Sequence, residues 1–413
     1  MRASDLWRQL FSLDRAFVEH VGVDPVAGAV VVRVRPHLRT ARRCGICRRR
    51  CPLYDHGHGR RRWRSLDLGT MRAFVEADAP RVQCPVHGVV VAAVPWARRN
   101  AGHTYAFDDQ VAWLATHCSK AAVCDLMRIA WPTVGAIIER VVDDARRHSD
   151  PFDGLRRIGI DEISHRRGQR YITVVVDHDS GRLLWAAPGR DQETVAAFFK
   201  LLGPLRCAQI ELVSADAGPW IANAVAEYCP NAQRCMDPFH VVAWATDALD
   251  QLRRDVWNTA RRSGQPTAAA NIKGARWVLW KNPQDLSGAQ RVALSQIATT
   301  NKPLYRGYLL KEQLREVFGL PHHRAMEMLQ GWLTWARRSR LAPFIRVAKT
   351  VTQHLPDIEA ALEHHLSNAR VEAINTRIRL ITRIAYGFRS AGALVAMAML
   401  SLGGYCPDLP GRT

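Results

Sequence analysis

Four potential metal ligands stand in two short pairs near the N-terminus, and two residues separate the members of each pair. The ligands are Cys44, Cys47, Cys84 and His87. Zinc binds four thiolate or imidazole ligands tetrahedrally, and two such knuckles supply them. Cys51 and His56 lie between the pairs and remain alternatives for one ligand position. We therefore expect a structural Zn²⁺ ion, whose binding energy would stabilise a module that the sequence predicts to be poor in apolar residues.

Two aspartates follow predicted strands. Asp161 comes directly after the apolar residues 158–160, and Asp216 comes directly after residues 212–215. If these strands are neighbours in a sheet, the two carboxylates converge and repel each other unless a divalent cation lies between them. We therefore expect Asp161 and Asp216 to bind Mg²⁺ or Mn²⁺.

A third carboxylate is expected on a helix near the C-terminus. Glu372 shares one helical face with Asn368, four residues before it, and Asn375, three residues after it. We expect Glu372 to lean toward the metal and the two asparagines to support the site. Asp237 ends a further predicted strand and is a competing ligand, while His240 is suited to orient a phosphate or the metal.

An α/β segment positions these acidic residues. Apolar runs bounded by turn residues predict strands over 158–163, 171–177 and 183–187, followed by helix, strand, helix and strand. Residues 239–364 show no strand pattern and carry tryptophans at helical spacing, which predicts an all-α insertion. A helix over residues 369–385 must then return to the sheet.

Helical spacing over residues 107–147 is interrupted at two points. Ser119 is suited to cap a second helix, and Pro132 is suited to the first turn of a third. Three short helices with a tight turn between the last two predict a helix-turn-helix, with residues 134–142 as the recognition helix in the major groove. Arg140 on this helix is a predicted DNA contact, and an ordinary helical linker is the alternative reading of the segment.

The composition favours a polyanionic partner. The chain of 413 residues carries 58 Lys and Arg against 38 Asp and Glu, a net charge of +20, which favours nucleic acid. A basic run is expected to contact phosphates without sequence preference, and it consists of Arg60, Arg61, Arg62 and Arg64. Ten cysteines are too few for a disulfide scaffold, and the first residues lack the layout of a secretory signal. We therefore expect a cytoplasmic, nucleoid-associated protein that does not enter a membrane.

The order of several motifs resembles the transposases of the ISL-three insertion-sequence family, within the DDE superfamily. The resemblance covers nearly the whole chain. Its motifs are Cys44-Gly-Ile-Cys47, Cys84-Pro-Val-His87, Ile158-Gly-Ile-Asp161-Glu162, Val213-Ser-Ala-Asp216, residues 231–241, 280–286 and 367–375, and Tyr386-Gly-Phe-Arg389. The family tends to have a cysteine where His87 stands, so this chain departs from the family's pattern at the fourth zinc ligand.

The resemblance implies an α/β fold with an RNase H-like mixed sheet, in which Asp161, Asp216 and Glu372 form the catalytic triad. The expected parts are a zinc-binding module (1–100), the helix-turn-helix (101–150), the first part of the catalytic core (151–238), the α-helical insertion (239–364) and the C-terminal helix and tail of the core (365–413).

The activity implied by the resemblance is DNA transposition. Two Mg²⁺ ions held by the triad would activate water or a 3′-hydroxyl and stabilise the leaving oxygen of an in-line phosphoryl transfer. The expected partners are double-stranded DNA, both terminal inverted repeats and target, and further copies of the chain in a homodimer or larger assembly.

Two other classes of protein are weighed against an active transposase. A DNA-binding regulator derived from a transposase would bind DNA without cutting it, although all three acidic positions are present. A zinc-dependent hydrolase would need an open coordination position beside a general base, which cysteine-rich ligation disfavours.

Overall fold

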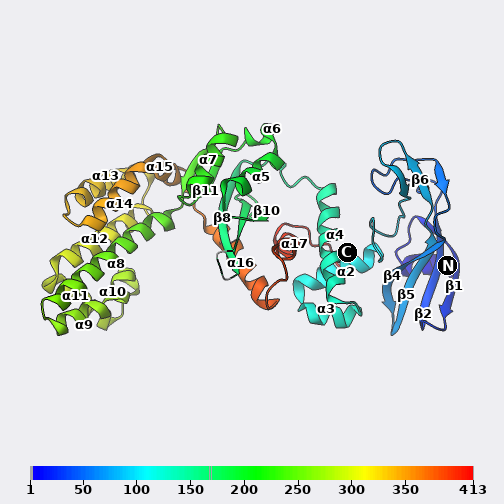
Figure 1. Ribbon diagram of the computed structural model, residues 1–413, viewed down its shortest axis with the longest axis horizontal. Helices are drawn as coiled ribbons and strands as arrows, with labels where there is room; N and C mark the ends of the chain where they lie inside the picture. The colour runs from blue at the N-terminus through cyan, green and yellow to red at the C-terminus, as the bar shows by residue number, and fades with distance from the viewer. Residues whose placement is uncertain (1–2, 167, 169, 413) are drawn as a thin grey trace. The chain divides into compact units, whose positions relative to one another are not determined.

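The computed structural model describes residues 3–166, 168 and 170–412. These residues form two compact units, of which the first comprises Met1–Pro151 together with Leu380–Thr413 and the second comprises Phe152–Arg379. Figure 1 traces the chain through both. Each unit has a hydrophobic core of its own.

A four-stranded sheet begins the first unit, preceded by helix α1 (Ala3–Leu10). Its order is β1-β2-β5-β4, with the bounds Ala16–Asp24, Ala29–Pro36, Met71–Asp78 and Arg60–Leu68. Val32, Val75, Trp63 and Trp96 belong to one buried cluster on this sheet. The expectation that the N-terminal module is poor in apolar residues is therefore wrong here, because arginines between the core residues of β4 conceal the apolar pattern.

A smaller, antiparallel sheet carries the two ligand pairs. Its order is β3-β6-β7, with the bounds Leu53–Asp55, Arg81–Cys84 and Gly88–Val91. Its buried cluster contains only Val82, Ala92 and three cysteines. For this sheet the predicted shortage of apolar residues is confirmed, so another source of stability is required.

Three helices follow, with the bounds Tyr105–His117 (α2), Lys120–Met127 (α3) and Trp131–His148 (α4). Ser119 Oγ accepts a hydrogen bond from the N–H of Ala122 at 3.2 Å, and Pro132 lies in the first turn of α4, as predicted. The chain turns by 98° between α3 and α4, within the range of a helix-turn-helix. No single helix among the described residues is long and apolar enough to cross a membrane; α3 and α4 meet that test only together, across the bend.

The C-terminal tail belongs to the first unit. Helix α17 (Ala391–Leu402) packs against α4 and α2. The division between the two compact units falls at Leu380, inside helix α16 (Ala369–Ile384). The assignment of residues 365–413 to the catalytic core stays a prediction.

A five-stranded mixed sheet forms the centre of the second unit. Its order is β10-β9-β8-β11-β12, with the bounds Leu183–Pro188, Arg170–Asp177, Arg157–Arg166, Leu212–Ala215 and Gln233–Met236. The first three strands are antiparallel, while β11 is parallel to both β8 and β12. All five strands were predicted. Asp161, however, lies within β8 rather than at its end, because pairing with β9 continues beyond the apolar residues.

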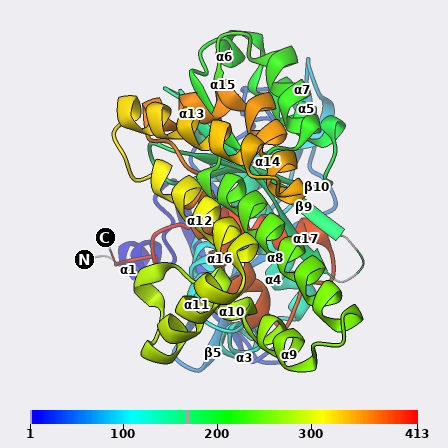
Figure 2. The same ribbon diagram turned by 90° about the vertical axis from the view of Figure 1, so that its left-hand side faces the viewer.

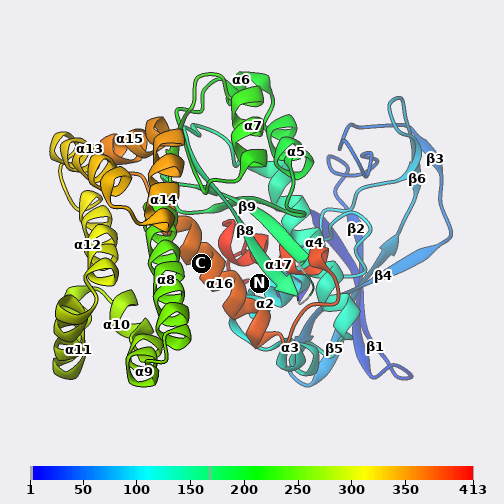
Figure 3. The same ribbon diagram turned by 60° about the vertical axis from the view of Figure 1, so that its left-hand side comes forward.

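Helices cover the two faces of this sheet. Ile158, Val213, Phe198 and Ile221 share a buried cluster that joins the sheet to α5 (Gln192–Leu202) and α7 (Pro219–Tyr228), and Figure 3 shows both helices together with the short α6 (Pro204–Cys207). Helix α16 lies on the opposite face. It approaches β8 closely at Gly159, where a Cβ atom would meet Val371.

The insertion between β12 and α16 is all-helical, as predicted. Its helices are α8 (Pro238–Arg262), α9 (Pro266–Gly274), α10 (Arg276–Trp280), η1 (Pro283–Asp285), α11 (Gly288–Thr300), α12 (Lys302–Val317), α13 (His322–Arg338), α14 (Ala342–Gln353) and α15 (Leu355–His364). They share one buried cluster around Trp332, whose indole N–H donates to the carbonyl of Leu310 at 2.7 Å. Figure 2 shows α8, α12, α13 and α14.

Candidate functional site

Asp161 and Asp216 lie side by side on neighbouring strands. In the parallel ladder of β8 and β11, Ser214 is paired with Gly159. The same register, continued by two residues, brings Asp216 directly beyond β11 and level with Asp161. Parallel neighbours are about 4.8 Å apart, so the two carboxylates are close enough to repel each other.

Asp237 extends this pair into a row of three aspartates. Ala215 is paired with Met236 in the parallel ladder of β11 and β12, so Asp216 and Asp237 both follow their strands at the same level. The N–H of Asp237 donates to the carbonyl of Ala215 at 3.1 Å. The row therefore contains the two predicted catalytic aspartates and the predicted competing ligand.

All three aspartates belong to the sheet face that α16 covers. Ile158 and Ile160 are buried with α5 and α7, and side chains alternate between the faces of a strand. Gly159 and Asp161 therefore face the other way, where Gly159 lies against Val371 of α16. The same alternation in β11 and β12 assigns the other two aspartates to this face.

Glu162 faces α7 instead, because it follows Asp161 directly in β8 and neighbouring side chains of a strand point to opposite faces. Its carboxylate accepts a hydrogen bond from the indole N–H of Trp220 at 2.7 Å and lies 3.9 Å from Arg190. Burial raises the pKa of Glu162, and the Trp220 hydrogen bond opposes this shift. The residue therefore supports the packing of α7.

Asn375 ties α16 directly to the row of aspartates. Its Nδ2 donates to Oδ2 of Asp161 at 2.8 Å, while Oδ1 of Asp161 accepts from the N–H of Glu162 at 2.8 Å. Asn375 is 1% exposed, and within the described chain its amide oxygen has no hydrogen-bond partner. A buried amide oxygen beside carboxylates is the donor type that hard divalent cations and their water ligands require.

Asn368 fixes the start of α16 to three strands. Its N–H donates to Asp237 at 3.2 Å, its Nδ2 to the carbonyl of Ile160 at 3.5 Å, and its Oδ1 accepts from the hydroxyl of Ser214. Ser214 Oγ also lies 2.6 Å from Nε2 of His178. Burial lowers the pKa of His178 to about 4, so the ring is neutral near pH 7.

The row carries negative charge that the imidazole of His240 compensates only in part. Burial raises the pKa of Asp161 to about 6; the N–H of Glu162 opposes the shift, and the charges of Asp216 and Asp237 add to it. His240 lies 3.0 Å from Asp237, and this contact raises the pKa of its imidazole. One buried and two half-buried carboxylates, with the imidazole of His240 beside them, are a donor set that fits a divalent cation.

Glu372 is exposed on α16, one turn from each asparagine that touches the sheet. Residues four before and three after a helical position share its face, so Glu372 projects from the side that carries Asn368 and Asn375. Among the described residues, the carboxylate oxygens of Glu372, Asp161 and Asp216 do not all lie within 4.8 Å of one another. The catalytic role of Glu372 stays a prediction.

The cysteine and histidine pairs do converge. In the part of the chain that the structure describes, one group of at least three His, Cys, Asp or Glu residues has all its ligand atoms within 4.8 Å, and it consists of Cys44, Cys47, Cys84 and His87. Cys47 Sγ lies 3.8 Å from Cys84 Sγ, and His87 Nδ1 lies 3.7 Å from Cys44 Sγ and 3.5 Å from Cys84 Sγ. A tetrahedral zinc site has sulfur–sulfur edges of about 3.8 Å and sulfur–nitrogen edges of about 3.6 Å. The four residues therefore fit zinc without rearrangement.

The alternative ligands Cys51 and His56 lie outside this group. Although burial acts to raise the pKa of the Cys84 thiol, hydrogen bonds from the N–H groups of Val86 and His87 lower it to about 6. A thiol with this pKa is largely a thiolate at neutral pH, which is the form that binds metal.

The predicted phosphate-binding arginines of β4 are mostly paired within the first unit. Arg60 and Arg62 both contact Glu76, at 3.5 and 2.8 Å. Arg61 donates to a backbone carbonyl at 2.9 Å. Arg64 is 8% exposed and is paired with Asp67. Its guanidinium group also lies over the rings of Phe74 and Phe107. The structure thus contradicts a surface role for Arg64.

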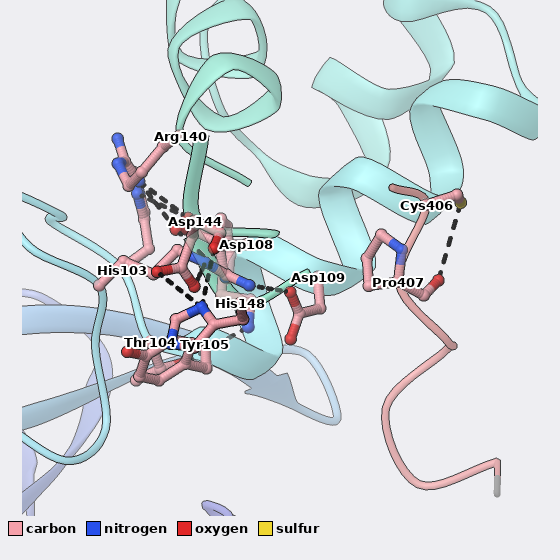
Figure 4. A network of polar contacts seen from close by, with 12 residues as sticks. His103, Thr104, Tyr105, Asp108, Asp109, Arg140, Asp144, His148, Cys406 and Pro407 are labelled. Atoms are coloured by element: carbon pink, nitrogen blue, oxygen red, sulfur yellow. Dashed lines mark hydrogen bonds and ion pairs between the residues drawn. The ribbon is translucent and has the colours of Figure 1, made fainter. Parts of the chain in front are cut away.

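A buried ion-pair network joins the helices of the helix-turn-helix (Figure 4). Asp108 of α2 is fully buried, and Arg140 of α4 donates to its two carboxylate oxygens at 3.1 and 2.8 Å. His103 lies 3.5 Å from Asp108. Arg98 pairs with Asp109 at 2.7 Å and with Asp144 at 3.0 Å. Arg140, predicted to contact DNA, is therefore engaged inside the protein.

Sequence reasoning missed the buried polar contacts behind the row. Ser214 interrupts the apolar strand that leads to Asp216, and a hydroxyl inside such a strand signals a buried partner. That partner, His178, follows β9 and has no distinguishing local pattern.

Three family models match this chain. One described as transposase matches residues 158–398, which include the aspartate row and α16. A second, described as the helix-turn-helix domain of transposase family ISL3, matches residues 92–142. A third, described as the zinc-finger of transposases IS204, IS1001, IS1096 and IS1165, matches residues 40–87.

Curated relatives agree with these matches. The transposase for insertion sequence element IS1557 of Mycobacterium tuberculosis (strain CDC 1551 / Oshkosh) is 54% identical over 436 residues, covering 100% of this chain and 98% of the relative. The transposase for insertion sequence element IS1001 of Bordetella parapertussis is 30% identical over 351 residues, covering 84% of this chain and 85% of the relative.

A zinc-finger segment, a DNA-binding helix-turn-helix and a DDE domain in one chain define a DNA-cleaving transposase. The chain belongs to the ISL3 family of transposases, and the resemblance seen in its sequence motifs is confirmed.

Proposed function

We propose that this transposase cuts and rejoins DNA at the ends of an insertion sequence by divalent-metal-dependent phosphoryl transfer at the aspartate row. The main support is the register that brings Asp161 and Asp216 level on the sheet face under α16, the helix that carries Glu372. The strand order β10-β9-β8-β11-β12, with three antiparallel strands followed by two parallel ones, supports an RNase H-like core.

Asp161, Asp216 and Glu372 are the proposed ligands of Mg²⁺ or Mn²⁺, and Asp237 borders the same site. Bound at this place, the ions would activate water or a 3′-hydroxyl and neutralise the leaving oxygen. Asn375 orients the carboxylate of Asp161. His240 uses Nδ1 toward Asp237, which leaves Nε2 to donate to a phosphate oxygen.

Recognition of the terminal inverted repeats is proposed for the helix-turn-helix, with residues 134–142 of α4 in the major groove. The buried side chains of α4 include Val134, Ile137 and Val141, which leaves the opposite side of the helix for DNA. Two element ends must be joined, so a dimer or larger assembly on DNA is part of the proposal.

A structural Zn²⁺ ion is proposed for the cluster of Cys44, Cys47, Cys84 and His87. The interatomic distances of a tetrahedral site and the small core of the surrounding sheet support it.

Cleavage of DNA that flanks the coding sequence, measured with Mg²⁺ for wild type and single variants, tests the proposed catalytic site. Asp161→Asn, Asp216→Asn and Glu372→Gln should each lower the cleavage rate by at least about 100-fold while DNA binding persists. Glu359→Gln, which removes an exposed carboxylate of α15, is the matched control and should cleave normally.

The same assay separates the enzyme from a silent DNA-binding regulator. If wild type and all three variants bind DNA equally and give the same background cleavage, the regulator is the correct reading. If only Glu372→Gln cleaves normally, the third ligand must be sought elsewhere, and Asp237→Asn is the next variant to measure.

A further inference from the structure

A cationic cavity in the first unit lies outside the residues considered so far for DNA contact. It measures about 560 Å³ and is bordered by the turn between α1 and β1, the approach to the first metal-ligand pair, residues 93–96, and the ends of α2 and α4. Its Asp, Arg and His lining residues are Asp14, Arg15, Arg43, Arg48 and His148. The lining therefore has an excess of positive charge.

The arginines of this cavity differ from those of β4. Arg60 and Arg62 are both paired with Glu76. Within the described residues, by contrast, Arg15, Arg43 and Arg48 have no carboxylate oxygen within 4.0 Å, and Asp14 does not pair with any of them. Their charge is therefore available to an external anion.

Two of these guanidinium groups are held in place by neutral acceptors. Arg43 donates to the carbonyls of Arg39 and Arg48 at 3.1 and 3.0 Å, which uses two of its five N–H groups. Arg48 donates to the hydroxyl of Tyr105 at the start of α2 at 3.3 Å. Guanidinium groups that are already ordered lose less entropy when they bind, and their planar N–H arrays suit phosphate oxygens.

We propose that this cavity binds backbone phosphates of DNA and couples the zinc-finger segment to the helix-turn-helix when the protein is bound. The proposal rests on the DNA binding expected of both segments, of which the zinc-finger match contributes Arg43 and Arg48 and the helix-turn-helix match contributes Tyr105. Charge complementarity supports the proposal, because DNA bound to these two segments presents phosphodiester anions to the arginines of the cavity. Such contacts add affinity without sequence preference.

The experiment measures the affinity of the full chain for a 50-base-pair duplex of mixed sequence as a function of salt concentration. Arg15→Gln and Arg48→Gln are combined, and Arg43 is left intact because it also ties two backbone segments together. Each lost phosphate contact should reduce the slope of log K against log salt by about 0.9, so the double variant should lose about 1.8 and bind about 60-fold more weakly at 0.1 M salt.

Arg35→Gln is the control, because it removes an exposed arginine of the same unit that is paired with Glu19 and lies outside the cavity. The slope of log K against log salt for Arg35→Gln should differ from that of wild type by less than about 0.45, the equivalent of half a phosphate contact. Zinc content and circular dichroism establish that every variant is folded.

The outcomes are distinct. If wild type does not bind the duplex, the proposed DNA binding itself fails; if wild type binds and the double variant keeps its slope, only the cavity proposal is overturned. Calorimetric titration with inorganic phosphate addresses a free anion as the occupant. Saturable phosphate binding that the double variant loses, together with an unchanged DNA slope, would also overturn the proposal.

Discussion

Gly159→Ala tests whether α16 must lie directly on the sheet for catalysis. A Cβ atom at this position would lie 2.3 Å from Cγ2 of Val371, 2.7 Å from Nε2 of His178 and 3.0 Å from Oγ of Ser214. Ordinary van der Waals contact begins at 3.4 Å. Helix α16 must therefore move away from β8 by about 1.1 Å or the core must deform.

A shift of this size reaches the site. The hydrogen bond from Asn375 to Asp161, now 2.8 Å long, would stretch to about 3.9 Å and break. Overpacking of a well-packed core costs about 1–3 kcal/mol of the free energy of unfolding. Misplacement of catalytic groups by about 1 Å lowers rates about 100-fold. We expect both effects, with DNA affinity unchanged.

Single-turnover cleavage with Mg²⁺ measures the rate, and urea unfolding measures the stability. Gly331→Ala in α13, where a Cβ atom would have no neighbour within 4 Å, is the control and should cleave like wild type. Val371→Ala added to Gly159→Ala removes the closest clash and should restore part of the rate. A Gly159→Ala protein that cleaves and unfolds like wild type would refute the proposed dependence of the site on α16.

Three further predictions concern the supports of the fold. Chelation of zinc, or Cys84→Ser, should expose the three-stranded sheet to proteolysis because its core is small, and unchanged protection would argue against a structural metal. Burial lowers the pKa of His103 to about 4, so this histidine acts to lower the free energy of unfolding as pH decreases from 6.5 to 4, while Asp108 beside it, whose pKa burial raises to about 6, acts in the opposite direction. Relative to wild type, His103→Gln should therefore lose less stability between pH 6.5 and pH 4, and the surface variant His323→Gln should not differ, as measured by unfolding at each pH. Lys311 is buried, donates to a backbone carbonyl at 3.0 Å and pairs with a buried carboxylate, so Lys311→Met should cost about 3 kcal/mol in urea unfolding, whereas the exposed Lys302→Met should cost almost nothing.

Local patterns predicted those parts of the fold that depend on nearby residues. Ser119 and Pro132 mark the starts of α3 and α4 because capping and the first helical turn involve only a few neighbouring groups. The five strands of the second sheet and the all-helical insertion follow from apolar periodicity for the same reason. The two ligand pairs could be recognised from their spacing, which a knuckle requires.

What the sequence could not predict depends on tertiary neighbours. The alignment of Asp161 with Asp216 is set by strand register, and the support of both by Asn375 is set by the close approach of α16 at Gly159. The arginines of β4 carry the same charge as those of the cavity, but Glu76 lies beside the former. Such pairings join residues that are distant in sequence, so composition cannot distinguish a paired arginine from a free one.

Because α17 packs against α4 and α2, the first unit can be completed only after the C-terminal residues have been synthesised. When residues 1–379 have emerged from the ribosome, every residue of the second unit is available for folding. The first unit then still lacks α17, which packs on its helix-turn-helix. The apolar side chains of α17, including Leu394, Met399 and Leu400, reach their place only afterwards. The second unit of a nascent chain can therefore fold before α17 stabilises the helix-turn-helix. A chain that ends before α17 would contain the helix-turn-helix without this packing.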